Sequence, residues 1–191
     1  MTDLANLWWQ VQERLAAQAW SCDDYTWTVP AVGGTIGDLL AAHATPGTVG
    51  RVEVARDLRQ QSESRIAPDG NVAPALTKAW LTLRRIDAAL GRAPIDLRSD
   101  VALFVGDRLI DKLGKDIAAS PYSAAINVTG PGCIEMRTYG RSEPQCAAVM
   151  SWPTLVGLAA GTTQLQEAEV DVAGDEAAID ALIDGLVRLR I

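Results

Sequence analysis

The spacing of apolar residues along this chain changes once, and that change limits the folds it can adopt. Up to about residue 118, apolar residues recur every three or four positions, which brings their side chains onto one face of an α-helix. From Tyr122 to Trp152, apolar and polar residues alternate in short runs, as they do in half-buried strands. The sequence therefore predicts an α+β fold, with a helical bundle in residues 1–118 and a smaller domain with an antiparallel sheet in residues 119–191.

Glycine and proline mark where the elements should begin and end. Gly91 and Gly114 close two helical stripes, and the segments 130–132 and 140–144 separate the alternating runs. The expected helices cover residues 3–20, 35–43, 46–64, 76–90, 97–113, 153–160 and 175–189. The expected strands form an antiparallel meander and one further strand, over residues 122–129, 133–139, 146–152 and 168–172.

Composition narrows the classes of partner. Of 191 residues, 48% are hydrophobic and 21% charged, as in ordinary globular proteins. A net charge of −7 repels phosphate backbones and anionic lipids, so neither nucleic acid nor a membrane is expected as the main partner. The sequence has no long apolar run and no basic-then-apolar start, which predicts a cytoplasmic protein. Cys22, Cys133 and Cys146 lack paired spacing and are expected to be buried free thiols.

The only histidine, His43, follows a strong helix start. Thr35 and Asp38 have the spacing of a capping box, in which each side chain accepts a hydrogen bond from a free backbone N–H group. Helical geometry would place His43 on the same face as Ile36, Leu39 and Leu40, pointing into the bundle. Two interpretations follow: a core histidine with one hydrogen bond, or a metal ligand.

This segment resembles the histidine-bearing helix of the mycothiol-dependent maleylpyruvate isomerase family, which is related to the DinB-like four-helix bundles. The matching residues are Gly33, Thr35, Ile36, Asp38, Leu39, Leu40 and Ala41. Gly34 replaces a tryptophan of the family pattern, and His43 comes one residue later than the pattern has it. One residue is a rotation of about 100° on a helix, which changes where the imidazole points.

The C-terminal part also resembles this family. The segment 152–161 and the Gly174-Asp175 turn, with a strand before it and a helix after it, are similar to the end of the family's sterol-carrier-protein-like domain. In the family, zinc is held by the first histidine and by a later Glu-x-x-x-His pair, and mycothiol acts beside it. The resemblance thus implies zinc and mycothiol as cofactors, with His43 as a metal ligand.

This chain has no second histidine. Against the family pattern, Val101 and Val105 occupy the positions of the missing ligands, which suggests a degenerate metal site. Carboxylates could replace them, because the pairs Asp96/Asp100 and Asp107/Asp111 have the i, i+4 spacing that lets two side chains meet one cation. Solvated helix faces explain these aspartates better.

Other site chemistries find less support. Ser120 or Ser123 would need a histidine base, and no Gly-x-Ser-x-Gly elbow is present. Gly33-Gly34 lacks the third glycine and the lysine of a phosphate loop. The tryptophans could line an apolar pocket, but Trp8 and Trp80 lie on helical core stripes.

Three functional hypotheses remain. The first is a divergent member of the isomerase superfamily that binds a small molecule or a thiol without catalysis. A homodimer is compatible with this hypothesis. The second is an active metal-dependent thiol transferase or isomerase that uses His43. The third is a carrier of apolar ligands that works through the C-terminal domain.

Overall fold

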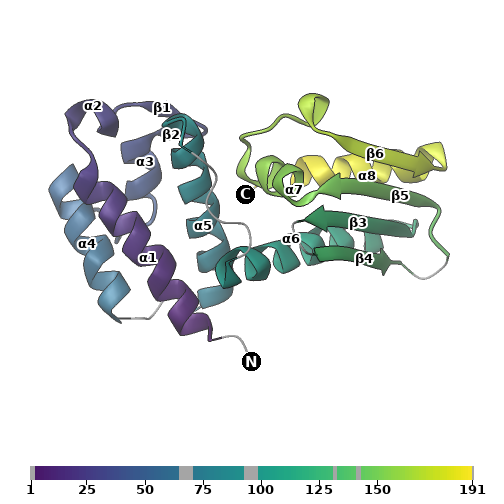
Figure 1. Ribbon diagram of the computed structural model, residues 1–191, viewed down its shortest axis with the longest axis horizontal. Helices are drawn as coiled ribbons and strands as arrows, with labels where there is room; N and C mark the ends of the chain where they lie inside the picture. Colours follow the sequence, from purple (N-terminus) through teal and green to yellow (C-terminus); the bar gives the residue numbers. More distant parts are fainter. Residues whose placement is uncertain (1–2, 65–70, 93–98, 131–132, 141–142, 191) are drawn as a thin grey trace. The chain divides into compact units, whose positions relative to one another are not determined.

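The computed structural model describes residues 3–64, 71–92, 99–130, 133–140 and 143–190. Its contacts divide the chain into two compact units, Met1–Ile95 and Asp96–Ile191. The first is helical apart from a two-stranded hairpin, and the second combines α-helices with a four-stranded sheet (Figure 1). This confirms the predicted α+β fold class.

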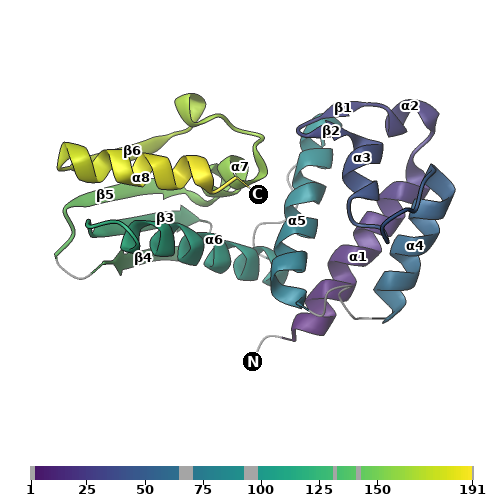
Figure 2. The ribbon, with the colours of Figure 1, turned by 180° about the vertical axis from the view of Figure 1, so that it is seen from behind.

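Unit 1 is a bundle of four main helices. Helix α1 packs against α4 and α5, and α3 packs against α5 (Figures 1 and 2). Trp8 and Trp80 are fully enclosed in its core, which confirms the prediction that they pack rather than line a surface pocket. The elements of the unit are α1 (Leu4–Ser21), α2 (Asp24–Trp27), β1 (Pro30–Ala31), β2 (Gly34–Thr35), α3 (Ile36–Ala41), α4 (Arg51–Ser64) and α5 (Val72–Ala89).

The start of α3 is as predicted, whereas the start of α4 is not. Thr35 Oγ1 accepts from the Asp38 N–H at 3.1 Å, and Asp38 Oδ2 accepts from the Thr35 N–H at 2.8 Å, which completes the capping box. Helix α4 begins at Arg51, five residues after the predicted start at Pro46. Gly47 and Gly50 have φ values of +91° and +87°, which no α-helix accommodates.

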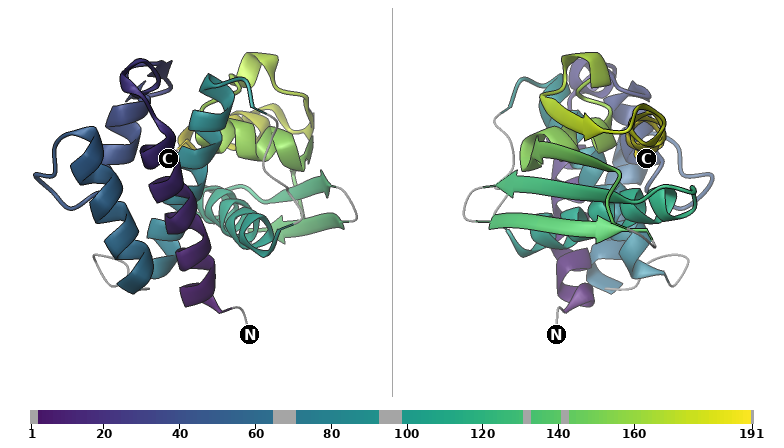
Figure 3. Two further views of the ribbon diagram at one scale, coloured as in Figure 1. Left: turned by 60° about the vertical axis from the view of Figure 1, so that its left-hand side comes forward. Right: turned by 90° about the vertical axis from the view of Figure 1, so that its right-hand side faces the viewer.

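Unit 2 is built on a sheet with strand order β4-β3-β5-β6. Helices α6 and α8 lie on one face of this sheet (Figures 2 and 3). Side chains on that face, such as Ile126 and Ala148, are fully buried, while those on the other face are half-buried or exposed. The elements are α6 (Asp100–Ala118), β3 (Ala124–Gly130), β4 (Cys133–Tyr139), β5 (Cys146–Ser151), α7 (Trp152–Ala160), η1 (Leu165–Glu167), β6 (Val170–Gly174) and α8 (Glu176–Arg188).

The predicted meander is wrong at one pair of strands. Strand β5 pairs with β3 in parallel, on the side away from β4, and only the outer pairs of the sheet are antiparallel. The chain between β4 and β5 must therefore pass the start of β3. It does so at Ser123, whose carbonyl accepts from the Gln145 N–H at 2.8 Å. Gly140, with φ +108°, allows this passage, since a Cβ there would lie 2.2 Å from Ser123 Oγ.

The division between the units also differs from the predicted one at residues 118 and 119. Helix α6 belongs to unit 2, because its buried face contacts β3, β4, α7 and α8. Periodicity identified this helix correctly as a helix, but a helical stripe does not say whether its partner is another helix or a sheet.

Candidate functional site

His43 lies just beyond α3, not within it. The helix ends at Ala41, and the His43 N–H donates to the Leu40 carbonyl at 3.1 Å in a tighter turn. The imidazole nevertheless reaches another helix, since its Nε2 lies 2.9 Å from Thr82 Oγ1 on α5. The side chain of His43 is half-buried and hydrogen-bonded to Thr82.

Helix α4 holds the same turn from another side. Gln61 Nε2 donates to the His43 carbonyl at 3.1 Å and to Asp57 Oδ2 at 2.7 Å. Asp57 also accepts from the N–H and the hydroxyl of Thr45, each at 2.8 Å. The Asp57 carboxylate thus attaches the turn after α3 to helix α4.

The charges nearest to His43 are positive. Burial, together with the positive charges of Lys78 and Arg85, lowers the pKa of His43 to about 4. Both cations lie within one turn of Thr82 on α5, at i−4 and i+3, so they share its side of the helix. The imidazole is neutral at pH 7 as a result.

These residues do not fit a zinc ion. Zinc in proteins takes three or four nitrogen, sulfur or carboxylate ligands, and no three His, Cys, Asp or Glu side chains gather anywhere in the part of the chain that the structure describes. Lys78 and Arg85 would also repel a cation beside His43. We therefore derive no chemical step through zinc or through a thiol bound to it.

The other predicted ligands lie in unit 2 or outside the described residues. Asp107 and Asp111 both form ion pairs with Arg137 on β4, the second at 2.7 Å, and so attach α6 to the edge of the sheet. Val101 and Val105 belong to the buried face of α6. Asp100 is exposed in the first turn of α6, whereas Asp96 lies outside the described residues.

Sequence reasoning missed two amide side chains in the bundle. Gln12 on α1 is completely buried, and neither its Nε2 nor its Oε1 has a hydrogen-bond partner among the described residues. Gln61 Oε1 is also buried, and no described residue forms a hydrogen bond with it. The signal was present, because Gln12 follows Trp8 by four residues on the apolar stripe of α1, where a polar residue interrupts the pattern.

Gln12 and Gln61 lie at a similar height along the bundle, because each precedes one partner of a hydrogen bond between α1 and α4. Together with His43 and Thr82, they form what we call the polar level of the bundle. Glu13, the next residue on α1, accepts from Ser62 Oγ at 2.9 Å, and Ser62 is the next residue after Gln61 on α4. His43 joins this level through its bonds to Gln61 and Thr82. Unpaired buried amides are costly, about 1–3 kcal/mol for each group, and they are rare unless water or a ligand satisfies them.

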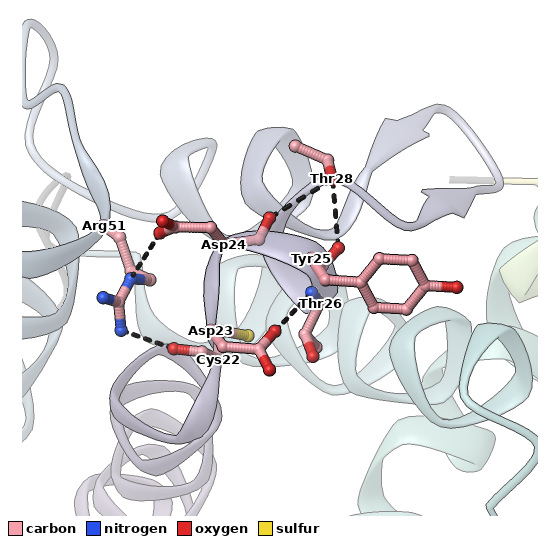
Figure 4. A network of polar contacts seen from close by, with 7 residues as sticks. All are labelled: Cys22, Asp23, Asp24, Tyr25, Thr26, Thr28 and Arg51. Atoms are coloured by element: carbon pink, nitrogen blue, oxygen red, sulfur yellow. Dashed lines mark hydrogen bonds and ion pairs between the residues drawn. The ribbon is translucent and has the colours of Figure 1, made fainter.

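A polar network at the other end of α1 positions the chain that leads to α3 (Figure 4). Arg51, at the start of α4, donates to the Cys22 carbonyl and lies 3.8 Å from Asp24. Asp23 caps α2 by accepting from the Thr26 N–H at 2.7 Å. Arg51 thus links the end of α1 and the start of α2 to the start of α4, and Asp23 caps α2, so the network has a structural role.

Of the thiols and serines that the sequence singled out, those in the described part of the chain are buried or hydrogen-bonded to the backbone. Cys22 and Cys146 are buried, and burial raises the pKa of both thiols. The side chain of Cys133 is not among those that the structure describes. Ser120 Oγ donates to the Ile117 carbonyl at 2.6 Å, and Ser123 is buried where the chain crosses β3.

Comparison with known proteins adds little. No family model and no curated protein matches this sequence. One solved structure, sterol carrier protein 2 like 2 from Aedes aegypti, matches 44% of this chain and 94% of its own, with 10% sequence identity and a TM-score of 0.32. That similarity is too low to support an inference. Among the described residues, no helix combines the length and apolarity needed to cross a membrane.

Proposed function

We propose that this protein is a divergent member of the mycothiol-dependent maleylpyruvate isomerase superfamily that binds a small molecule without a metal. The binding site is the polar level of the bundle around His43, Thr82, Gln61 and Gln12. The observation that carries this proposal is the fully buried Gln12, whose amide has neither of its hydrogen-bonding atoms paired. A ligand with a donor and an acceptor would satisfy both.

The charges near this level favour a ligand with an acidic group. Lys78 and Arg85 act on His43 from the same side of α5, and Asp57 already accepts three hydrogen bonds. An anion would therefore meet a positive field with a neutral imidazole beside it. This function corresponds to the first of the three hypotheses drawn from the sequence. The side chains at the polar level suit a ligand with carboxylate or amide groups better than they suit a metal cation.

Gln12→Leu tests this site, since leucine has nearly the same size and no polar atoms. We expect the ligand-free variant to be more stable than the wild type by about 1–2 kcal/mol, because an unpaired buried amide is removed. Maleate, chosen as a small dicarboxylate probe, should raise the unfolding midpoint of the wild type and not of the variant. Calorimetry at constant ionic strength measures both effects.

Gln60→Leu is the matched control, because Gln60 is exposed on α4. It should leave both the midpoint and the effect of maleate unchanged. A Gln12→Leu protein that is less stable than the wild type and still responds to maleate would show that the amide is structural and would count against the site.

A second function, transport of an apolar ligand by unit 2, has one observation in its favour. Met136 and Val149 are 69% and 40% exposed, and both lie beside Asn127 on the same face of the sheet. Asn127 Oδ1 is buried there without a hydrogen-bond partner among the described residues. In the same calorimetric experiment, laurate would stabilise unit 2 rather than unit 1 if this function were correct.

A further inference from the structure

The last turn of α5 brings charged side chains together beside α1. Gly91 has φ +61° and ends the helix, and the Arg92 N–H returns to donate to the Asp87 carbonyl at 2.9 Å. This return places Arg92 over the final turn of the helix. Its guanidinium donates to Gln18 Oε1 on α1, which fixes the side chain between the two helices.

Arg84, one turn before Asp87, is the least satisfied charged group of this cluster. Its side chain is only 15% exposed, and its Nη1 lies 3.9 Å from Asp87 Oδ2, too far for a hydrogen bond. Nε and Nη1 are both buried without a hydrogen-bond partner among the described residues. A buried guanidinium with two unpaired N–H groups is strongly unfavourable unless an acceptor is supplied.

Asp87 is the carboxylate that the described residues place in this cluster, and it cannot balance the cations around it. Burial raises the pKa of Asp87, while Arg84, Arg92 and Arg14 of α1 act in the opposite direction. Burial also lowers the pKa of Arg84. Three guanidinium groups and one carboxylate leave an excess of two positive charges here, in a chain whose net charge is −7.

We propose that Arg84, Arg92 and Arg14 form a binding site for an oxyanion, the carboxylate or phosphate group of a small molecule. Guanidinium groups present parallel N–H donors that match the two oxygens of either group. Arg84, with its unpaired donors, forms the floor, and the exposed Arg14 and Arg92 form the rim. Asp87 orients Arg84 and does not contact the anion.

This site is separate from the polar level around His43. Arg84 is two residues from Thr82 on α5, a rotation of about 200°, so the two side chains leave the helix in opposite directions. The inference therefore does not rest on the proposed function, and either one can fail alone.

Calorimetry of the full chain in phosphate, succinate or chloride at equal ionic strength tests this inference. Phosphate or succinate at about 10 mM should raise the midpoint of unit 1 by about 3–6 °C relative to chloride. The anion with the larger shift identifies the class of ligand. Arg84→Met should abolish the shift, and Arg56→Met, at an exposed position on α4, should keep it.

Arg92→Met provides a second variant in case Arg84→Met does not fold, because Arg92 is exposed and truncating it leaves the core intact. Titration calorimetry with inorganic phosphate should show an affinity about tenfold lower for Arg92→Met than for the wild type. A shift no larger in phosphate and succinate than in chloride would overturn the proposal, as would unchanged affinity in Arg92→Met.

Discussion

Removal of the last helix, by ending the chain after Val172, should unfold unit 2 and leave unit 1 folded. Helix α8 buries Leu182 and Leu186, and Leu189 follows it into the same core. Burial of three leucines contributes about 5–9 kcal/mol before the loss of conformational entropy. This is comparable with the whole net stability of a small domain, so unit 2 cannot remain folded without it.

Thermal unfolding followed by circular dichroism measures this result. The shortened chain should lose the transition of unit 2 and keep that of unit 1. Leu182→Ala and Val187→Ala form a matched pair within the intact helix, since Leu182 is fully buried and Val187 is 61% exposed. The first should cost about 2–4 kcal/mol and the second almost nothing. A shortened protein that is soluble, monomeric and cooperative in both transitions would show that α8 is an accessory.

Gly106→Ala should destabilise unit 2 by about 3 kcal/mol, although alanine is the better helix former by about 1 kcal/mol. Gly106 lies on α6 against Trp152, the first residue of α7. An added Cβ would lie 0.9 Å from the Cη2 atom of that indole ring. The rigid ring cannot bend away, so α6 and α7 must separate and expose apolar surface.

Gly185→Ala on α8 is the control for this substitution. Its added Cβ would lie 3.0 Å from Leu113 Cδ1, the end of a flexible side chain that can move. We expect it to be neutral or slightly stabilising in urea denaturation. Equal effects of the two substitutions would mean that Trp152 does not pack directly on the backbone of α6.

Local signals predicted the elements of this fold well. The capping box of α3 and the stripes of α1 and α5 appear as expected, and β4 covers the predicted residues 133–139. Each of these depends on residues a few positions apart, which a single sequence contains. The short helix α2 was missed because its four residues show no periodicity.

Long-range pairing was not predictable in the same way. The alternation of apolar and polar residues in β5 does not indicate whether this strand pairs with β4 or with β3. Its position depends on the six-residue connection from β4, which passes the start of β3 at Ser123. The assignment of α6 to the second unit depends on the same non-local packing. For the site, the sequence indicated the inward position of His43, but its partner Thr82 is 39 residues away.

The amount of zinc bound by the untagged protein tests the central claim, that the bundle binds a small molecule without a metal. The protein would be produced in zinc-supplemented medium, dialysed and analysed by mass spectrometry for metal per chain. We predict far less than one zinc per chain, with the same value in wild type and in His43→Ala. Close to one zinc per chain in the wild type, lost in His43→Ala, would contradict the claim and support a metal-dependent enzyme.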